Sequence, residues 1–279
     1  MKPTTDRNFH GMTAVMSGGS RGIGLAIATE LARGGANLVL LAKTDSPDPR
    51  LPGTIHTAVE AIETAGGRAV GVVGDVRNDA DVQRAAAAAV ETFGGIDICI
   101  NNASVLNLAK TEDLPLKQFD LIQQVNVRGT FALTQACLPH LKKSQVAHVL
   151  TLSPPLNMAT EWLGKHPGYM LGKYGMSLLA MGFAEEFREY EIASNCLWPE
   201  TTIATAAVKN LLGGYEGTSH ARSPQIMADA AAALLSRSPG DLTGQTLLDV
   251  EVLRDAGITD LSVYGGTEPL DYDIFVDRA

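Results

Sequence analysis

Cysteine is scarce in this chain, and long hydrophobic runs are absent. The 279 residues include three cysteines, Cys99, Cys137 and Cys196, which cannot all pair and of which no two have metal-binding spacing. We therefore expect neither a disulfide framework nor a metal site. No apolar run approaches the roughly 18 residues of a membrane span, and residues 1–11 lack the hydrophobic region of a secretory signal. The simplest expectation is a cytoplasmic protein without a membrane span.

A basic surface is lacking as well. The formal net charge of -9 at pH 7 would repel a phosphate backbone, and no basic stripe stands out against it. Nucleic acid is therefore not an expected partner. The length of 279 residues and the ordinary composition, 45% hydrophobic, suit one large α/β domain with a sizeable core, which we expect to span residues 1–279.

Short apolar runs alternate with helical patterns along the chain. The predicted strands are Thr13–Ser17, Asn37–Ala42, Ala69–Gly74, Ile96–Ile100, Ala147–Leu152, Ile192–Leu197 and Gln245–Asp249. The predicted helices are Ile23–Arg33, Ile55–Ala65, Ala80–Phe93, Leu116–Lys142, Tyr169–Tyr190 and Pro224–Leu235. This alternation is typical of βαβ units and predicts a single Rossmann-type, doubly wound parallel sheet of about seven strands with helices on both faces.

Three stretches interrupt the alternation, namely Thr44–Gly53, Leu156–Gly168 and Thr201–Ser223. We predict irregular loops there, the last with the glycines of a mobile flap in its second half. All three follow predicted strand ends, where open α/β sheets bind ligands.

A glycine-rich turn joins the first predicted strand to the first helix. Gly18, Gly22 and Gly24 leave backbone amides and a helix dipole accessible to a pyrophosphate. The expected cofactor contacts of this turn are Ser17, Gly18, Ser20, Arg21, Gly22, Ile23 and Gly24. The alternative is a merely structural turn.

The second strand ends at Ala42 without the carboxylate that usually binds the adenosine ribose of NAD, and Lys43 follows instead. Lys43 and Arg21 would attract a 2'-phosphate, so we expect NADP(H) and consider NAD(H) the less favoured cofactor. The alternative is that both cations are solvated surface residues.

Tyr169 and Lys173 stand four residues apart in a predicted helix and therefore share one face. A free phenol titrates near about 10, and a neighbouring ammonium would favour its ionised form. The pair predicts proton exchange with a carbonyl or alcohol substrate. The alternative for Tyr169 is an amphipathic core residue at the start of a helix.

Together these motifs resemble the short-chain dehydrogenase/reductase family over about Thr13 to Glu251, and Asp75-Val76, Asn101-Asn102-Ala103 and Asn126 follow the family's order. The resemblance implies that Asp75 and Val76 flank the adenine and that Asn102 and Ala103 shape the nicotinamide ribose side. It further implies that Lys173 bonds that ribose, that Asn126 holds a relay water, and that the nicotinamide lies near Pro199, Thr202 and Ile203.

Two positions depart from the family pattern. Ser153 is followed by Pro154 where a second, substrate-orienting serine is usual, and Glu200 replaces the glycine after Pro199. Ser153 is the remaining candidate for a catalytic hydroxyl, or else it bonds local backbone. The longer loop after it would re-aim Ser153 or bring Asn157 inward.

The predicted reaction is hydride transfer between NADP(H) and an alcohol or ketone, with Tyr169 as acid and base. The expected cleft walls, Leu106, Leu108, Leu156, Met158, Trp162 and Trp198, favour an apolar, lipid- or acyl-like substrate unless they are core or subunit contacts. A homodimer or homotetramer is expected, with the tail 252–279 at its interface. The alternatives are an impaired NADP(H)-binding sensor or scaffold, and another reaction such as double-bond reduction or epimerisation.

Overall fold

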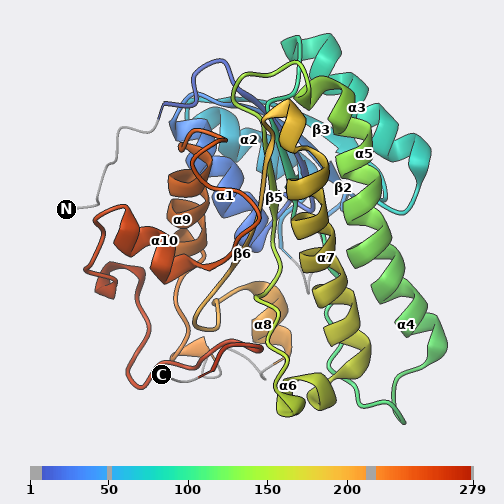
Figure 1. Cartoon of the computed structure of the whole chain (residues 1–279), viewed down its shortest axis with the longest axis vertical. Helices are drawn as coiled ribbons and strands as arrows, with labels where there is room; N and C mark the ends of the chain where they lie inside the picture. The colour runs from blue at the N-terminus through green and yellow to red at the C-terminus, as the bar shows by residue number, and fades with distance from the viewer. Residues whose placement is uncertain (1–7, 49–51, 212–217, 278–279) are drawn as a thin grey trace.

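Seven parallel strands form one twisted sheet, in the order β3-β2-β1-β4-β5-β6-β7 (Figure 1). The computed structural model describes residues 8–48, 52–211 and 218–277. The strands are β1 Thr13–Ser17, β2 Asn37–Ala42, β3 Arg68–Val73, β4 Ile98–Asn101, β5 His148–Thr151, β6 Ala193–Trp198 and β7 Thr246–Leu248. The order reverses beside β1, so that Ser17 pairs with both Leu41 and Asn101 and a crevice opens at the strand ends. The predicted fold class is confirmed.

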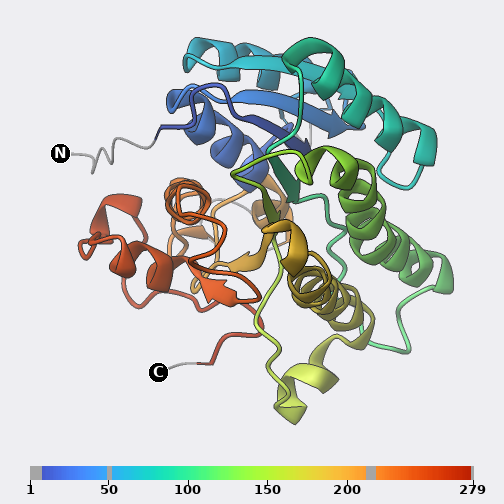
Figure 2. The same cartoon turned by 45° about the horizontal axis from the view of Figure 1, so that its top comes forward.

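Helices cover both faces of this sheet, as Figures 1 and 2 show from two sides. The helices longer than six residues are α1 Gly22–Arg33, α2 Ile55–Thr64, α3 Asp79–Phe93, α4 Leu116–Ile122, α5 Gly129–Leu141, α7 Pro167–Glu186, α9 Gln225–Leu235 and α10 Asp249–Asp255. Helices α1, α2, α9 and α10 contribute to one apolar cluster, and α3, α5 and α7 contribute to another. None of the helices in the described ranges is both long and apolar enough to cross a bilayer.

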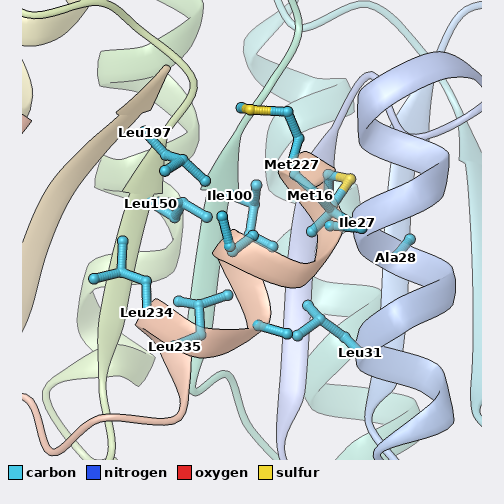
Figure 3. Packing of buried hydrophobic residues seen from close by; sticks show 14 of the residues in the cluster. Met16, Ile27, Ala28, Leu31, Ile100, Leu150, Leu197, Met227, Leu234 and Leu235 are labelled. Carbon is cyan, nitrogen blue, oxygen red and sulfur yellow. The ribbon is translucent and has the colours of Figure 1, made fainter. Parts of the chain in front are cut away.

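Successive side chains of β1 point to opposite faces of the sheet and so belong to the two different apolar clusters. Met16 points into the cluster under α1 and α9, whereas Val15 points into the cluster under α3 and α5. In Figure 3, Met16 lies close to Ile27 of α1 and Met227 of α9. Alanine-rich α9 is buried along almost its whole length, so it can lie close to both α1 and the sheet. This packing fixes the start of α1 at the crevice.

Some predicted boundaries were wrong. The single helix expected over 116–142 contains a π-helical turn, Gln123–Arg128, between α4 and α5, and Asn126 lies in that turn. The helix expected over 169–190 ends at Glu186, and a 3-10 turn follows over Arg188–Tyr190. The strand expected to reach Asp249 stops at Leu248, because Asp249 begins α10.

The three predicted loops are only partly irregular. Helix α6, Thr160–Lys165, lies within the second, and α8, Ala206–Leu211, lies within the third. Two features of these loops lie outside the described residues: Pro49 in the first, and the flap glycines Gly213, Gly214 and Gly217 in the third.

The C-terminal segment returns to the carboxyl end of the sheet. Tyr272 forms an antiparallel bridge with Thr201, and the Asp273 amide donates to the Glu200 carbonyl at 3.0 Å. In Figure 1 this segment, drawn in red, lies at the same end of the molecule as α6 and α8. The tail that we expected at an oligomer interface thus packs on the crevice of its own chain, and a contact with a second copy stays a prediction.

Candidate active site

Two adjoining cavities follow the carboxyl ends of β1, β2, β4 and β6. The first, of about 410 Å³, contains Gly18, Lys43 and Asp75, and the second, of about 320 Å³, contains Tyr169 and Lys173. Five residues line both of them: Ile23, Asn102, Ser104, Thr205 and Ala207. The two cavities therefore form one elongated groove along the sheet edge.

The sequence-predicted contacts are divided between these cavities. The first is lined by Gly18, Ser20, Arg21, Gly22, Ile23, Gly24, Lys43, Asp75, Val76, Asn102 and Ala103. The second is lined by Ile23, Asn102, Tyr169, Lys173, Pro199, Thr202 and Ile203. Ser17 lies behind the turn, where its hydroxyl accepts a hydrogen bond from the Ala103 amide at 3.1 Å.

Two glycines of the turn, Gly18 and Gly24, have no room for a side chain. Gly18 has a φ of +76°, and a Cβ atom there would lie 2.9 Å from both Asn102 Nδ2 and Ala103 Cα. A Cβ on Gly24 would lie 2.5 Å from the same Asn102 nitrogen. Asn102 in turn donates to the carbonyls of Ser17 at 3.0 Å and Gly18 at 2.8 Å. The loop after β4 thus holds the turn open at the start of α1, where a dinucleotide's phosphates bind.

A cluster of charges surrounds the far end of the first cavity. Arg21 donates to the Gly53 carbonyl at 2.7 Å, while its buried Nε has no hydrogen-bond partner among the described residues. The exposed Lys43 ammonium lies 3.6 Å from the Asp75 carboxylate. Arg77, which the sequence analysis did not identify, hydrogen-bonds the same carboxylate and holds the Asp75 pKa at about 2. Arg21 and Lys43, the two cations that line this cavity, fit a bound phosphate.

Tyr169 and Lys173 face the second cavity from one side of α7. Both are buried, at 5% and 3% exposure. The Lys173 ammonium donates to the Leu152 carbonyl at 2.7 Å and lies 4.9 Å from the centre of the Trp198 ring. The geometry requires Gly172 between them, because a Cβ there would lie 2.6 Å from Ile122 in the neighbouring α4.

The predicted lowering of the phenol pKa is wrong for this structure. Burial raises the Tyr169 pKa, and the nearby Asp273 carboxylate raises it further, because both disfavour the phenolate. Burial also lowers the Lys173 pKa to about 7, against the opposing charge of Asp273. Burial is therefore the main cause of both shifts.

The structure does not bring Asn126 and Ser153 to the cavity wall. Asn126 is fully buried in the π-helical turn, where its Oδ1 accepts from the Val105 amide at 2.8 Å. Ser153 is also fully buried, beside the Cys196 thiol, and its hydroxyl makes no hydrogen bond of normal geometry with the described residues. The relay role of Asn126 stays a prediction, and Ser153 lies behind the cavity lining.

Half of the predicted cleft walls lie elsewhere. Leu106, Leu108 and Trp198 line the second cavity. Leu156 and Trp162 instead pack in an aromatic cluster around Phe275, and Met158 is 66% exposed. Asn157 donates to the Asp277 carboxylate at 2.9 Å rather than pointing inward. The C-terminal segment occupies this side of the site and so redirects the loop after β5.

Besides Arg77, sequence reasoning missed two functional candidates, Ser104 and Asp273. Ser104 follows the Asn-Asn-Ala motif, lines both cavities and hydrogen-bonds the Tyr169 hydroxyl. Asp273 lines the second cavity from the end of the chain. The apolar run from Ile274 to Val276 is a signal for a buried segment, but nothing in it indicates the part of the chain against which it packs.

Comparison with known families agrees with this geometry. Residues 12–214 match the family model described as short chain dehydrogenase. The chain belongs to this family. As a short-chain dehydrogenase it is an oxidoreductase-type protein with an NAD(P)(H)-binding Rossmann fold.

This short-chain dehydrogenase resembles hydroxysteroid dehydrogenase-like protein 2, with 48% identity over 281 residues to the Xenopus tropicalis protein and 46% over 280 residues to the human protein. Both comparisons cover 100% of this chain and 66% of the relative, so the chain spans about two thirds of the length of these relatives. The sequence alone predicts this resemblance through its segments 42–44, 153–157, 184–187 and 198–199, and the comparison confirms it.

Two solved structures are similar over nearly the whole short-chain dehydrogenase. A protein from Xanthomonas campestris assigned as a dehydrogenase is 49% identical with a TM-score of 0.92, covering 97% of this chain and 100% of its own. A short chain dehydrogenase from Mycobacterium thermoresistibile is 52% identical with the same TM-score, covering 97% and 96%. Both structures therefore agree with the fold and the family of this chain.

Proposed function

We propose that this protein transfers a hydride between NADP(H) and an apolar alcohol or ketone, with Tyr169 exchanging the proton. One observation carries the proposal. The cavity that contains Tyr169 and Lys173 adjoins the cavity of the glycine turn, so a dinucleotide bound along the groove would present its reactive end to the phenol.

The preference for NADP(H) rests on Arg21 and Lys43. Arg21 and the exposed Lys43 both line the first cavity, and β2 ends without a carboxylate. Structures with this fold bind either cofactor: L-sorbose reductase from Gluconobacter frateurii was solved with NADPH, and carveol dehydrogenase from Mycobacterium avium with NAD. The choice in this chain therefore depends on its own cations.

The roles of the chain's residues follow from their positions. The bound cofactor supplies the hydride. Tyr169 donates its proton to the carbonyl oxygen, or accepts one from the alcohol in the reverse reaction. Lys173, held by the Leu152 carbonyl, would bond the cofactor ribose and stabilise negative charge at the phenol.

An apolar substrate suits the second cavity. Leu106, Leu108, Trp198 and Ile274 are among the many apolar residues that line it. A cavity of about 320 Å³ lies within the range of small-molecule sites. The name of the hydroxysteroid dehydrogenase-like relatives agrees with an apolar alcohol, and it supports no narrower choice of substrate.

A homodimer or homotetramer remains part of the proposal. Phe131 on α5 and Leu171, Leu178 and Met181 on α7 are between 41% and 58% exposed, an apolar surface that a second copy would cover. Light scattering on the purified chain tests this. A monomer at micromolar concentration would contradict it, as would a dimer unaffected by Leu178→Glu.

The activity is tested with NADPH and a panel of ketones and aldehydes that includes cyclohexanone and decanal. We expect the wild-type protein to turn over at least one of these carbonyls. Tyr169→Phe should bind NADPH normally and lose nearly all of the turnover. NADPH binding without turnover of any carbonyl would favour the alternative, an impaired sensor or scaffold. Equal turnover by Tyr169→Phe would contradict the role of the phenol.

A further inference from the structure

A carboxyl group from the end of the chain enters the cavity that contains Tyr169 and Lys173. Asp273 lines this cavity and is half-buried. Its charge acts on both neighbours, since it raises the Tyr169 pKa and opposes the lowering of the Lys173 pKa by burial. Asp273 is therefore a third titratable group beside the proposed acid and base.

Backbone contacts on both sides fix the position of Asp273. Before it, Tyr272 pairs with Thr201, and after it, the Ile274 carbonyl accepts from the Trp198 indole at 3.1 Å. The Asp273 amide donates to the Glu200 carbonyl, and its Oδ1 accepts from the Ile274 amide at 2.8 Å. The carboxyl is thus presented by a segment that is attached to β6 and the loop after it.

The position matters because a usual hydroxyl is missing from this site. Proline 154 stands where the family has its second serine, and Ser153 is buried beside Cys196. Ser104 hydrogen-bonds the Tyr169 hydroxyl itself, and Lys173 donates to the Leu152 carbonyl. Asp273 lines the same cavity and its charge acts on Tyr169, so its carboxyl, when protonated, can supply a second donor to a substrate oxygen.

We propose that Asp273 is a catalytic residue whose protonated carboxyl donates a hydrogen bond to the substrate oxygen, alongside the Tyr169 hydroxyl. The inference rests on the proposed function. During reduction the hydride adds to the carbonyl carbon, Tyr169 gives its proton to the oxygen, and the Asp273 proton stays on Asp273. The ionised carboxylate would instead repel the negative charge that develops on that oxygen, so the protonated form is the active one.

The surroundings of Asp273 favour this protonated form. Burial raises its pKa to about 7, the Ile274 hydrogen bond lowers it, Asp249 at the start of α10 raises it, and Lys173 lowers it. Tyr169 faces it from α7, and the Glu200 carboxylate and Arg222 guanidinium, 3.7 Å apart, border Asp249. Asp249 and Lys173 act on the Asp273 pKa in opposite directions, so burial remains the main reason that it is raised.

The test compares Asp273→Asn and Asp273→Ala with Asp271→Asn, an exposed neighbour on the same segment. Each variant is assayed from acidic to alkaline pH with NADPH and either cyclohexanone or decanal. We expect wild-type kcat/KM for reduction to fall as the pH rises through about 7. Asp273→Asn, which keeps a donor and cannot ionise, should lose that fall. The kcat/KM of Asp273→Ala should be about 100-fold lower than that of the wild type at acidic pH. The pH profile of Asp271→Asn should match the wild-type profile.

Lys173 is the competing source of a fall near the same pH, and the asparagine variant separates the two. If Lys173 causes the fall, removing the Asp273 charge lowers the Lys173 pKa further and moves the fall to lower pH, which overturns the proposal. A kcat/KM of Asp273→Ala within twofold of the wild-type value at every pH would also overturn the proposal.

NADPH affinity gives a readout that does not require turnover. Asp273 does not line the glycine-turn cavity, so both Asp273 variants should bind NADPH within about threefold of the wild type, a difference worth less than about 1 kcal/mol. A tenfold or larger loss would show that the side chain serves to hold the cofactor or the fold, and would overturn the assignment. Wild-type protein that turns over no carbonyl contradicts the proposed function and this inference together, whereas wild-type turnover that Asp273→Ala leaves intact contradicts the inference alone.

Discussion

Phe275 lies against Tyr169, with ring centroids 6.3 Å apart and ring planes at 18°. Its ring also contacts Trp162, Tyr174 and Trp198, at centroid distances of 6.1, 5.1 and 6.4 Å. The side chain is 3% exposed. One residue near the end of the chain thus connects α6, α7 and β6 behind the proposed catalytic tyrosine.

Replacing Phe275 by alanine should therefore destabilise the protein. Truncation of a buried phenylalanine typically costs about 3–5 kcal/mol, through lost burial and the cavity left behind. Urea unfolding measures the loss, and Val263→Ala, at a side chain 53% exposed, is the control that should stay within about 0.5 kcal/mol of wild type. A loss under 1 kcal/mol for Phe275→Ala would mean that the C-terminal segment is only loosely attached.

The Arg21 guanidinium should distinguish NADPH from NADH. A hydrogen bond to a charged group contributes about 1.5–3 kcal/mol, so Arg21→Ala should weaken NADPH binding by about tenfold or more. NADH affinity should change little, because NADH carries no 2'-phosphate. Arg33→Ala at the other end of α1, where Arg33 pairs with Glu30, is the matched control. Fluorescence titration measures both affinities, and equal losses for the two cofactors would contradict the assignment.

Local sequence determined most of the cofactor half of the site. The turn between β1 and α1 and the four-residue step from Tyr169 to Lys173 are short-range features, whose geometry a strand or helix dictates by itself. Asp273 and Phe275 reach the same site through pairing with β6 and the loop after it, and no spacing in the sequence specifies that partner. The predicted lowering of the Tyr169 pKa was wrong for a related reason, because the burial that raises this pKa is a property of the folded chain.

Asp249 should make stability depend on pH. It is fully buried, and burial raises its pKa to about 7, well above the usual value of 3.8. The folded state therefore holds a proton that the unfolded state releases as the pH rises above about 4. The contribution of this group is fully present below pH 3.8 and is lost as the pH rises to about 7.

Unfolding experiments in urea across this pH range measure the effect. Asp249→Asn keeps an oxygen to accept from the Glu200 amide and removes the titration. Its slope of unfolding free energy against pH should be less negative than the wild-type slope, by at most about 1.4 kcal/mol per pH unit. Parallel slopes for the two proteins would contradict the raised pKa. Asp255→Asn, at an exposed position of α10, should leave the slope unchanged.

Two glycines of α7 provide the sharpest test of how the tyrosine helix is placed. A Cβ on Gly172 would lie 2.6 Å from the Ile122 side chain, whereas Gly182 on the same helix has open space around it. Gly172→Ala should therefore push α7 away from α4, costing about 1–3 kcal/mol of stability and displacing both Tyr169 and Lys173. Gly182→Ala should be neutral or stabilise by up to about 1 kcal/mol, because alanine is the better helix former. The double variant Gly172→Ala/Ile122→Ala tests the cause. Alanine at residue 122 lacks the Cγ2 atom that the new Cβ would meet, so the double variant should lose less stability than the two single variants combined. Strictly additive losses would place the conflict elsewhere along the helix.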